Sequence, residues 1–202
     1  RRKEYKVAYL TFDDGPTPAL TSKILDILAE EDVKATFFVI GNLAERYPEM
    51  VKREYEEGHG IANHTYSHVF KHIYKKTDNF VNEIKKTERV LQSILGDDKK
   101  FRLIRFPGGS FGDALKPYRN AANKAGFAYV DWNSLNGDAE TVESRSPEQL
   151  IARLKETVNG KSSIVVLMHD APQKKTTVEA LPDIIRYLKS EGYHFELLPG
   201  SR

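Results

Sequence analysis

The sequence contains no cysteine among its 202 residues. This absence excludes a disulfide scaffold, thiolate metal ligands and a cysteine nucleophile. An excess of charge is also absent, because 31 basic residues are balanced by 29 acidic ones and the net charge is only +2. A chain so nearly neutral has no strong overall field to attract nucleic acid, so we expect no nucleic-acid partner.

Long hydrophobic runs are missing as well. No apolar run approaches the roughly 18 residues of a membrane-spanning helix, so we expect no membrane insertion by this domain. The chain begins at Arg1, with neither a methionine nor a visible signal peptide. We interpret residues 1–202 as one globular domain excised from a longer secreted or anchored precursor, since this length and a hydrophobic content of 40% suit a single folded unit.

Short apolar runs alternate with segments of helical periodicity along the whole chain. The runs predict strands at 7–12, 35–40, 59–63, 102–106, 127–132, 163–168 and 194–197. The intervening segments predict helices that begin near positions 17, 48, 78, 114, 147 and 177. Seven or so strands joined through helices imply parallel pairing and an α/β architecture, either a barrel or a doubly wound sheet. In both architectures the chemistry gathers at the carboxyl ends of the strands.

The first predicted strand ends in two adjacent carboxylates, in the segment Thr11-Phe12-Asp13-Asp14-Gly15-Pro16. Adjacent side chains at a strand end point to different sides. One carboxylate could therefore bind a cation while the other handles a proton. Asp and Gly also favour turns, so an ordinary turn is the competing interpretation.

Two histidines follow the third predicted strand at a spacing of four residues. His64 and His68 would share one face of a helical turn, which predicts that both imidazoles reach one metal ion. Two imidazoles and one carboxylate are a common ligand set of hydrolytic zinc sites. His72 continues the spacing but lies farther from the strand end. The competing interpretation is a pair of surface histidines at a chance spacing.

Two further strands end in polar side chains. Arg105 precedes Pro107-Gly108-Gly109, where a guanidinium could hold a carboxylate and the glycines would let the backbone approach a ligand. His169 follows the most apolar strand, and histidine titrates near neutrality, which suits proton donation. A surface arginine and a structural histidine are the competing interpretations. The common position of all these residues at strand ends favours a functional site.

Taken together, these motifs resemble those of carbohydrate esterase family 4, the NodB-like polysaccharide deacetylases. The motifs that carry the resemblance are Thr-Phe-Asp-Asp-Gly-Pro at 11–16, His-Thr-Tyr-Ser-His at 64–68, Arg-Phe-Pro at 105–107 and Leu-Met-His at 167–169. The resemblance covers 9–198. It implies a distorted (β/α) barrel with a groove across its top, and it makes 1–202 a single deacetylase catalytic domain.

The resemblance implies a divalent metal ion as cofactor. Asp14, His64 and His68 would bind it, with zinc expected first and cobalt, nickel, manganese or iron as alternatives. A metal-bound water would be the nucleophile.

The resemblance also implies the residues that move protons. Asp13 would be the general base that takes a proton from the water, and Arg105 would hydrogen-bond that base. His169 would be the general acid that protonates the leaving amine. The backbone N–H of Gly108 would stabilise the developing oxyanion.

Two positions depart from the family pattern. Gly108 stands where the family often has a tyrosine after the Arg-x-Pro proline, which removes a side-chain wall of the groove. In the fourth family motif the best match places Asp138 at the expected aspartate, with Ala139 in place of a tryptophan. Asp138 would then hold the imidazole of His169, and Asp131 is the competing candidate for that role.

The predicted activity is removal of N-acetyl groups from an acetylated aminosugar polymer, either peptidoglycan or a chitin-like chain. Trp132 and Leu167 are candidate walls of a small apolar pocket for the acetyl methyl group, although both could equally be core residues. The alternatives are an O-acetyl esterase acting on xylan and an inactive carbohydrate-binding module. We expect a polysaccharide as partner, a monomer, and bacterial-type export to the extracellular space or the cell wall.

Overall fold

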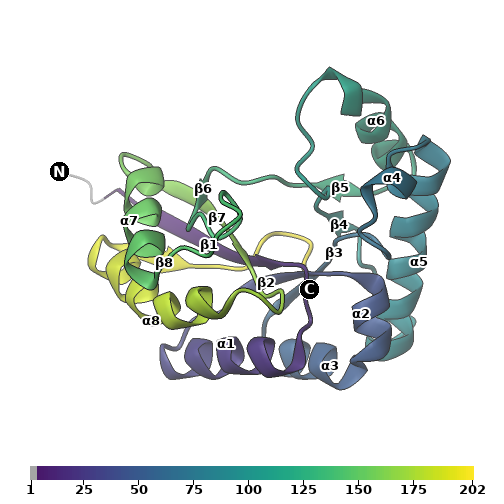
Figure 1. Ribbon diagram of the computed structural model, residues 1–202. Coiled ribbons are helices and arrows are strands. Elements are labelled where there is room, and N and C mark those ends of the chain that lie inside the picture. Colours follow the sequence, from purple (N-terminus) through teal and green to yellow (C-terminus); the bar gives the residue numbers. More distant parts are fainter. Residues whose placement is uncertain (1–3) are drawn as a thin grey trace.

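Eight strands form one sheet at the centre of the molecule, and helices cover it (Figure 1). The computed structural model describes residues 4–202. In chain order the strands are β1 (Lys6–Asp13), β2 (Thr36–Val39), β3 (Gly60–Asn63), β4 (Leu103–Ile104), β5 (Ala128–Tyr129), β6 (Ser134–Leu135), β7 (Ser163–His169) and β8 (Tyr193–Phe195).

The strand order makes the sheet an open, curled barrel. Along the sheet the order is β5-β4-β3-β2-β1-β7-β6, and β8 pairs with the first residues of β1. Every pairing is parallel. Within the described part of the chain no pairing joins β5 to β6, so the barrel stays open there. The prediction of an α/β fold, a distorted (β/α) barrel of seven or so parallel strands, is confirmed.

Helices connect most of the strands and lie outside the sheet (Figure 1). They are α1 (Pro18–Glu30), α2 (Gly41–Arg46), α3 (Pro48–Glu56), α4 (Phe70–Ile73), α5 (Thr77–Leu95), α6 (Lys116–Lys124), α7 (Pro147–Val158) and α8 (Lys175–Ser190), with a single 3₁₀ turn, η1 (Asp113–Leu115), before α6. None of the helices found in residues 4–202 is long and apolar enough to cross a membrane.

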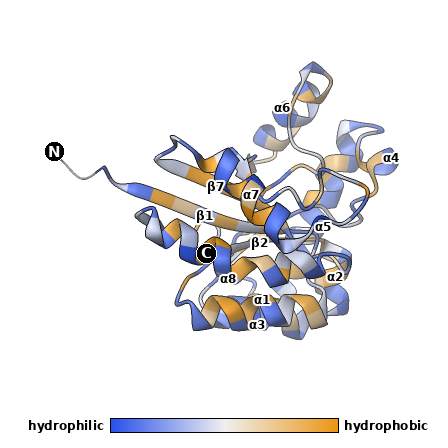
Figure 2. Ribbon diagram, turned by 60° about the vertical axis from the view of Figure 1, so that its left-hand side comes forward, coloured by the Kyte–Doolittle hydropathy of each residue, from blue (hydrophilic) through white to orange (hydrophobic). Residues whose placement is uncertain are grey.

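Helix α1 shows how the sequence pattern produces the core. Pro18 occupies its first turn, where an intrahelical N–H is not needed. Leu20, Ile24 and Leu28 recur at helical spacing and are buried in the main hydrophobic cluster. Hydrophobic and hydrophilic residues alternate along α1 in the same way in Figure 2, which also shows how hydrophobic β1 is.

The predicted strand 127–132 is only partly correct. β5 ends at Tyr129, and the chain then runs without a helix to β6. Beside β6 the side chain of Asn133 adds to the backbone pairing with β7: its Nδ2 donates to Ser163 O at 2.9 Å, and its Oδ1 accepts from Val165 N at 2.8 Å. β6 itself has only two residues, too few for a periodic signal, so the sequence pattern did not predict it.

The register of the strands determines which side chains meet at the carboxyl edge. Asp13 at the end of β1 is paired with His169 at the end of β7 and with Phe38 in β2. Asn63 at the end of β3 is paired with Ile104 in β4. The residues that follow these strand ends therefore converge on one edge of the sheet.

Helix α3 carries one buried acidic side chain on the face that packs against the rest of the protein. Glu54 is fully buried, and neither carboxylate oxygen has a hydrogen-bond partner among residues 4–202. Burial, together with the charge of Asp170, raises the pKa of Glu54 well above its usual value. The folded protein therefore holds this side chain protonated at a pH at which the unfolded chain ionises it.

In the wild type, the buried Glu54 is expected to lower the free energy of unfolding as the pH rises, and Glu54→Gln should remove this effect. The raised pKa means that the wild type is most stable below the unfolded pKa of glutamate and loses up to about 1.4 kcal/mol per pH unit as the pH rises toward the folded pKa. The variant should match the wild type in urea unfolding at pH 5 and exceed it at pH 8. Glu56→Gln, on the exposed side of the same helix, is the control. Equal pH dependence of the Glu54→Gln variant and the wild type would show that Glu54 is ionised in the folded protein.

Candidate active site

A cavity of about 290 Å³ opens at the carboxyl ends of the strands. Nine of the ten predicted site residues line it, namely Asp13, Asp14, His64, His68, Gly108, Trp132, Asp138, Leu167 and His169. The tenth, Arg105, is completely buried and contacts Asp13. The structure thus brings together residues from five separate segments of the chain.

Asp14, His64 and His68 lie close enough to ligate one ion. Asp14 Oδ1 is 3.2 Å from His64 Nε2 and 3.3 Å from His68 Nε2. One ligand atom from each residue lies within 4.8 Å of the others. His72 is not part of this group; its Nε2 instead lies 3.7 Å from Glu83 Oε1.

The four-residue spacing of the two histidines does not arise from a helical turn, and that prediction is wrong. Residues 64–69 form an irregular loop between β3 and α4, in which Thr65 and His68 have positive φ angles of 71° and 57°. A helix would leave the backbone N–H groups of this loop to pair within the helix. Here the backbone N–H groups of residues 65–69 pair with side chains instead.

Glu83 of α5 accepts two of these backbone hydrogen bonds and one from a side chain. Its Oε2 accepts hydrogen bonds from the backbone N–H groups of Tyr66 at 2.8 Å and Ser67 at 2.7 Å, and its Oε1 accepts one from Ser67 Oγ at 2.6 Å. Asn63 adds a second anchor, because its Oδ1 accepts from Thr65 N at 3.0 Å. The sequence motif contains the histidines but not Glu83, so motif reasoning missed the residue that holds their loop.

The electrostatic environment of this group favours a cation. Burial would raise the pKa of Asp14, but His64, His169 and His68 outweigh it and hold that pKa well below its usual value. Burial would also lower the pKa of His64, yet Asp13 and Asp14 raise it. Burial and the neighbouring His64 lower the pKa of His68. An ionised carboxylate thus faces two crowded imidazoles, an arrangement that a shared positive ion stabilises.

One carboxylate oxygen of Asp13 is held by a hydrogen bond, and the other faces the cavity. Arg105 Nη1 donates to Asp13 Oδ1 at 2.9 Å and to Thr11 Oγ1 at 2.7 Å. The remaining guanidinium N–H groups donate to the carbonyl oxygens of Val130 and Asp131. Asp13 Oδ2 is left facing the cavity, 3.8 Å from His64 Nε2.

The orientation of His64 is determined by the same strand end. Its Nδ1 lies 2.8 Å from the carbonyl oxygen of Arg105. A carbonyl only accepts, so Nδ1 carries the proton and donates, which leaves Nε2 free to ligate. Arg105 therefore contacts the site twice, through its side chain to Asp13 and through its backbone to His64.

His169 pairs with Asp138 and not with Asp131. Its Nδ1 lies 2.7 Å from Asp138 Oδ1, and its backbone N–H donates to Asp138 Oδ2 at 2.9 Å. Burial lowers the pKa of His169, but the hydrogen bond and charge of Asp138, with the charges of Asp13 and Asp14, raise it to about 9. The carboxylate of Asp131 instead accepts hydrogen bonds from Ser110 N and Ser110 Oγ.

A family model described as polysaccharide deacetylase matches residues 1–130 of the chain. The chain belongs to this family. A peptidoglycan-N-acetylglucosamine deacetylase of Bacillus cereus is 40% identical over 197 residues, which cover 96% of this chain and 70% of that protein. A chitooligosaccharide deacetylase of Sinorhizobium fredii is 32% identical over 202 residues, covering 95% of this chain and 89% of that protein.

Solved structures of relatives have the same fold. A carbohydrate esterase family 4 esterase of Streptococcus mutans superposes with a TM-score of 0.89 at 36% identity, over 96% of this chain and 86% of that one. The catalytic domain of a peptidoglycan N-acetylglucosamine deacetylase from Eubacterium rectale superposes with a TM-score of 0.87 at 33% identity, over 100% and 92% of the two chains. The protein is a polysaccharide deacetylase and a hydrolase of carbohydrate esterase family 4.

In this polysaccharide deacetylase the donor set fits the metal dependence of the family. Asp14 Oδ1 is buried and lacks a hydrogen-bond partner among the residues that the structure describes. Such an oxygen is costly to bury unless a cation or a donor satisfies it. The two imidazoles that face it would complete a three-ligand set with room left for solvent and substrate.

Gly15 shows why the first motif of the deacetylase needs a glycine. A Cβ atom at this position would lie 2.1 Å from the Oδ2 atom of Asp170, which is buried and accepts a hydrogen bond from Thr21 Oγ1 at 2.7 Å. Burial, with the charges of Asp14 and Asp13, raises the pKa of Asp170 to about 7. The sequence did not single out Asp170, whose side chain lies directly behind the turn that carries Asp14.

Loss of the Glu83 carboxylate is expected to weaken metal binding by this deacetylase. A Glu83→Ala variant should bind zinc about 10- to 100-fold more weakly, because the loop with both histidines loses three hydrogen bonds. Glu83→Gln retains the shape of the side chain, so its affinity for zinc should fall much less. Titration of the metal-free protein with zinc measures both.

The matched control is Glu88→Ala, which removes another buried carboxylate of α5 that contacts Arg102 and not the histidine loop. If Glu83→Ala and Glu88→Ala bound zinc equally well, Glu83 would have no part in positioning the ligands.

Proposed function

We propose that this deacetylase removes N-acetyl groups from an acetylated aminosugar polymer, with peptidoglycan or a chitin-like chain as substrate. The observation that carries the proposal is the convergence of Asp14, His64 and His68 with Asp13 and His169 on one cavity. Relatives named for peptidoglycan N-acetylglucosamine and for chitooligosaccharide support the substrate class.

Asp14, His64 and His68 would hold a divalent ion, and zinc fits two imidazoles and a carboxylate best, with cobalt, nickel, manganese or iron as alternatives. When bound, such an ion lowers the pKa of a water and polarises the acetyl carbonyl. The protein residues around it would carry out the proton transfers.

Asp13 is the proposed general base. Its Oδ1 is held by Arg105, and its Oδ2 faces the cavity beside His64. A carboxylate held at one oxygen keeps the other aimed at the attacking water, whose proton it accepts as the carbon–oxygen bond forms. The buried Arg105 also keeps this base oriented when substrate enters.

His169 is the proposed general acid, on the strand next to Asp13. Its Nδ1 is bound to Asp138, so its Nε2 proton can be given to the amide nitrogen as the carbon–nitrogen bond breaks. An amine leaves only once protonated, which is why an acid separate from Asp13 is needed. With a pKa raised to about 9, His169 would be protonated at neutral pH.

The remaining cavity residues would bind the acetyl group. The N–H of Gly108 is proposed to donate to the developing oxyanion. Trp132 and Leu167 line the cavity and are the proposed apolar walls for the acetyl methyl group. We further propose that the enzyme acts as a monomer in the extracellular space or at the cell wall, where polymers of this class lie.

Asp138→Asn is expected to shift the alkaline limb of the pH profile of kcat toward lower pH. The acid form of His169 is the active one, and its pKa of about 9 depends on the Asp138 carboxylate. Removing that charge lowers the pKa, so activity falls at a lower pH, and kcat at neutral pH drops about 10- to 100-fold. Asp131→Asn is the matched control and should leave the limb in place. If the alkaline limb shifted in Asp131→Asn and stayed in place in Asp138→Asn, Asp131 would be the residue that orients His169.

O-acetyl ester hydrolysis, on xylan or a similar glycan, is the second candidate, because the Streptococcus mutans relative is described as an esterase. Acetate release should be measured on a chitin oligomer, a peptidoglycan digest and acetylated xylan. Release from the aminosugar substrates supports the proposal. Release from xylan alone would replace it with the esterase.

A further inference from the structure

Aromatic rings are exposed beside the cavity. The large hydrophobic side chains that are strongly exposed among residues 4–202 are Tyr5, Val69, Phe70, Phe111 and Val142. Two of them, Phe70 and Phe111, are rings that pack against the two glycines following Pro107. Exposed rings cost free energy in a free protein, and when they cluster at a polar cavity they mark a binding surface.

Phe70 covers one side of this turn. The ring is 47% exposed and meets His68 edge-on with 5.4 Å between ring centroids. A Cβ atom on Gly108 would lie 3.0 Å from Phe70 Cε1, so the ring lies against the backbone of the turn. The side-chain wall that Gly108 cannot provide is thus provided by a residue of α4.

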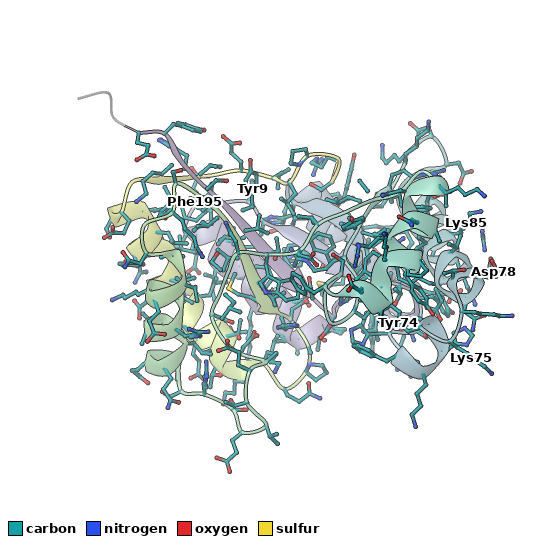
Figure 3. The ribbon with its side chains drawn as sticks, turned by 90° about the horizontal axis from the view of Figure 1, so that it is seen from above. Tyr9, Tyr74, Lys75, Asp78, Lys85 and Phe195 are labelled. Atoms are coloured by element: carbon teal, nitrogen blue, oxygen red, sulfur yellow. The ribbon has the colours of Figure 1, made fainter. Side chains whose placement is uncertain are left out.

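Two hydrogen bonds hold the end of α4 against the turn that follows Pro107. Tyr74, which follows α4, donates from its hydroxyl to Pro107 O at 2.7 Å, and Tyr118 of α6 donates to Tyr74 O at 2.6 Å. Tyr74 lies on the side of the molecule opposite Phe195 of β8 (Figure 3). These bonds hold Phe70 in place before any ligand arrives, which reduces the entropy lost on binding.

Phe111 and Trp132 cover the other side. Their ring centroids are 5.4 Å apart at an interplanar angle of 88°. A Cβ atom on Gly109 would lie 2.4 Å from Phe111 Cε2 and 3.0 Å from Trp132 Cη2. The neighbouring Ser110 is anchored on both sides, by the carboxylate of Asp131 and by Arg119, which donates to Ser110 O. This pair is therefore also preorganised.

We propose that Phe70 on one side, and Phe111 with Trp132 on the other, stack on the sugar rings that flank the acetylated residue of the polymer. The proposal rests on the proposed function, because it takes an acetylated aminosugar chain as the ligand. Both surfaces adjoin the cavity in which the acetyl group would be cleaved, since Gly108 and Trp132 line it. The faces of pyranose rings carry C–H groups, which pack on the negative face of an aromatic ring. Phe70 and Phe111 are then specificity-determining residues that favour chains over single sugars.

The chain contains a single tryptophan, Trp132, so its fluorescence reports binding at this cavity alone. The wild type, Phe70→Ala and Phe111→Ala should be titrated with a pentamer of N-acetylglucosamine. Acetate release from the pentamer and from the dimer should then be compared. Each variant should bind the pentamer about tenfold more weakly and show a correspondingly higher KM with kcat unchanged, because a buried aromatic contact is worth about that factor. Release from the dimer should change less.

Tyr5→Ala is the matched control, since Tyr5 is an exposed ring that stacks on His194 and does not line the cavity. It should behave as the wild type, and Phe70→Tyr, which keeps an aromatic ring without adding a second tryptophan, should restore the affinity lost in Phe70→Ala. If both alanine variants bound and processed the pentamer as the wild type does, the inference would be wrong and the deacetylase function would stand. If the wild type bound the pentamer more tightly than the two alanine variants but released no acetate, the proposed function would fail while the stacking surface remained.

Discussion

His64→Ala and Asp14→Ala variants will release acetate at least about a thousandfold more slowly than the wild type, because each removes one of three proposed metal ligands. Both should also bind less zinc per protein molecule. The measurement is acetate release from a chitin oligomer together with the metal content of the purified variants.

His72→Ala is the control for these variants. This histidine continues the spacing of the motif, yet its side chain is 56% exposed and lies outside the Asp14 group. It should retain full activity and full metal content. Full acetate release by His64→Ala or Asp14→Ala would refute the assignment of the metal site.

His169→Ala will lower kcat on an N-acetyl substrate by about 100- to 10,000-fold, the usual contribution of a general acid. Metal content should be unchanged, because His169 is not one of the grouped ligands. An O-acetyl ester has a better leaving group and should be affected much less. The same variant assayed on both substrates therefore reports the role of the acid directly.

Equal losses on the amide and on the ester would contradict this role, and would indicate that His169 shapes the cavity instead of donating a proton. Measuring the thermal unfolding midpoint of the variant separates that outcome from simple misfolding. His169 is partly exposed at the cavity, so the fold should tolerate alanine there.

The order of strands and helices could be predicted from the sequence because short apolar runs and segments of helical periodicity alternate along it. The run 163–168 became β7, and the helical periodicity of 78–95 became α5. Neither pattern chose between a barrel and an open sheet; the family resemblance did. The short elements α2, α4 and β6 have six, four and two residues, too few for a periodic signal.

The candidate site could be predicted where a motif names its residues. The carboxylates of the first motif and the histidines of the second do line one cavity. The geometric reason given for the histidines was wrong, because Glu83 and two positive φ angles make a loop where spacing suggested a helix. The sequence also left open whether Asp131 or Asp138 holds the imidazole of His169. Only the path of the chain from β6 to β7 decides which carboxylate reaches it.

Residues that act across the fold left no signal in the sequence. The sequence analysis did not single out Phe70, because its contact with Gly108 appears only once α4 folds onto the turn. Glu54 lies in the helix predicted to begin near position 48, but nothing in the local sequence indicates that α3 buries it completely. Burial and long-range contacts of single polar or aromatic residues depend on tertiary packing, which local patterns do not encode.

The central claim is that Asp14, His64 and His68 hold a metal ion that deacetylation requires. The most direct test is acetate release from a chitin oligomer by the wild-type protein before chelation, after chelation, and after zinc or cobalt is returned. We expect release to stop in the chelator and to recover with the metal. Undiminished release from the fully metal-free protein would contradict the account.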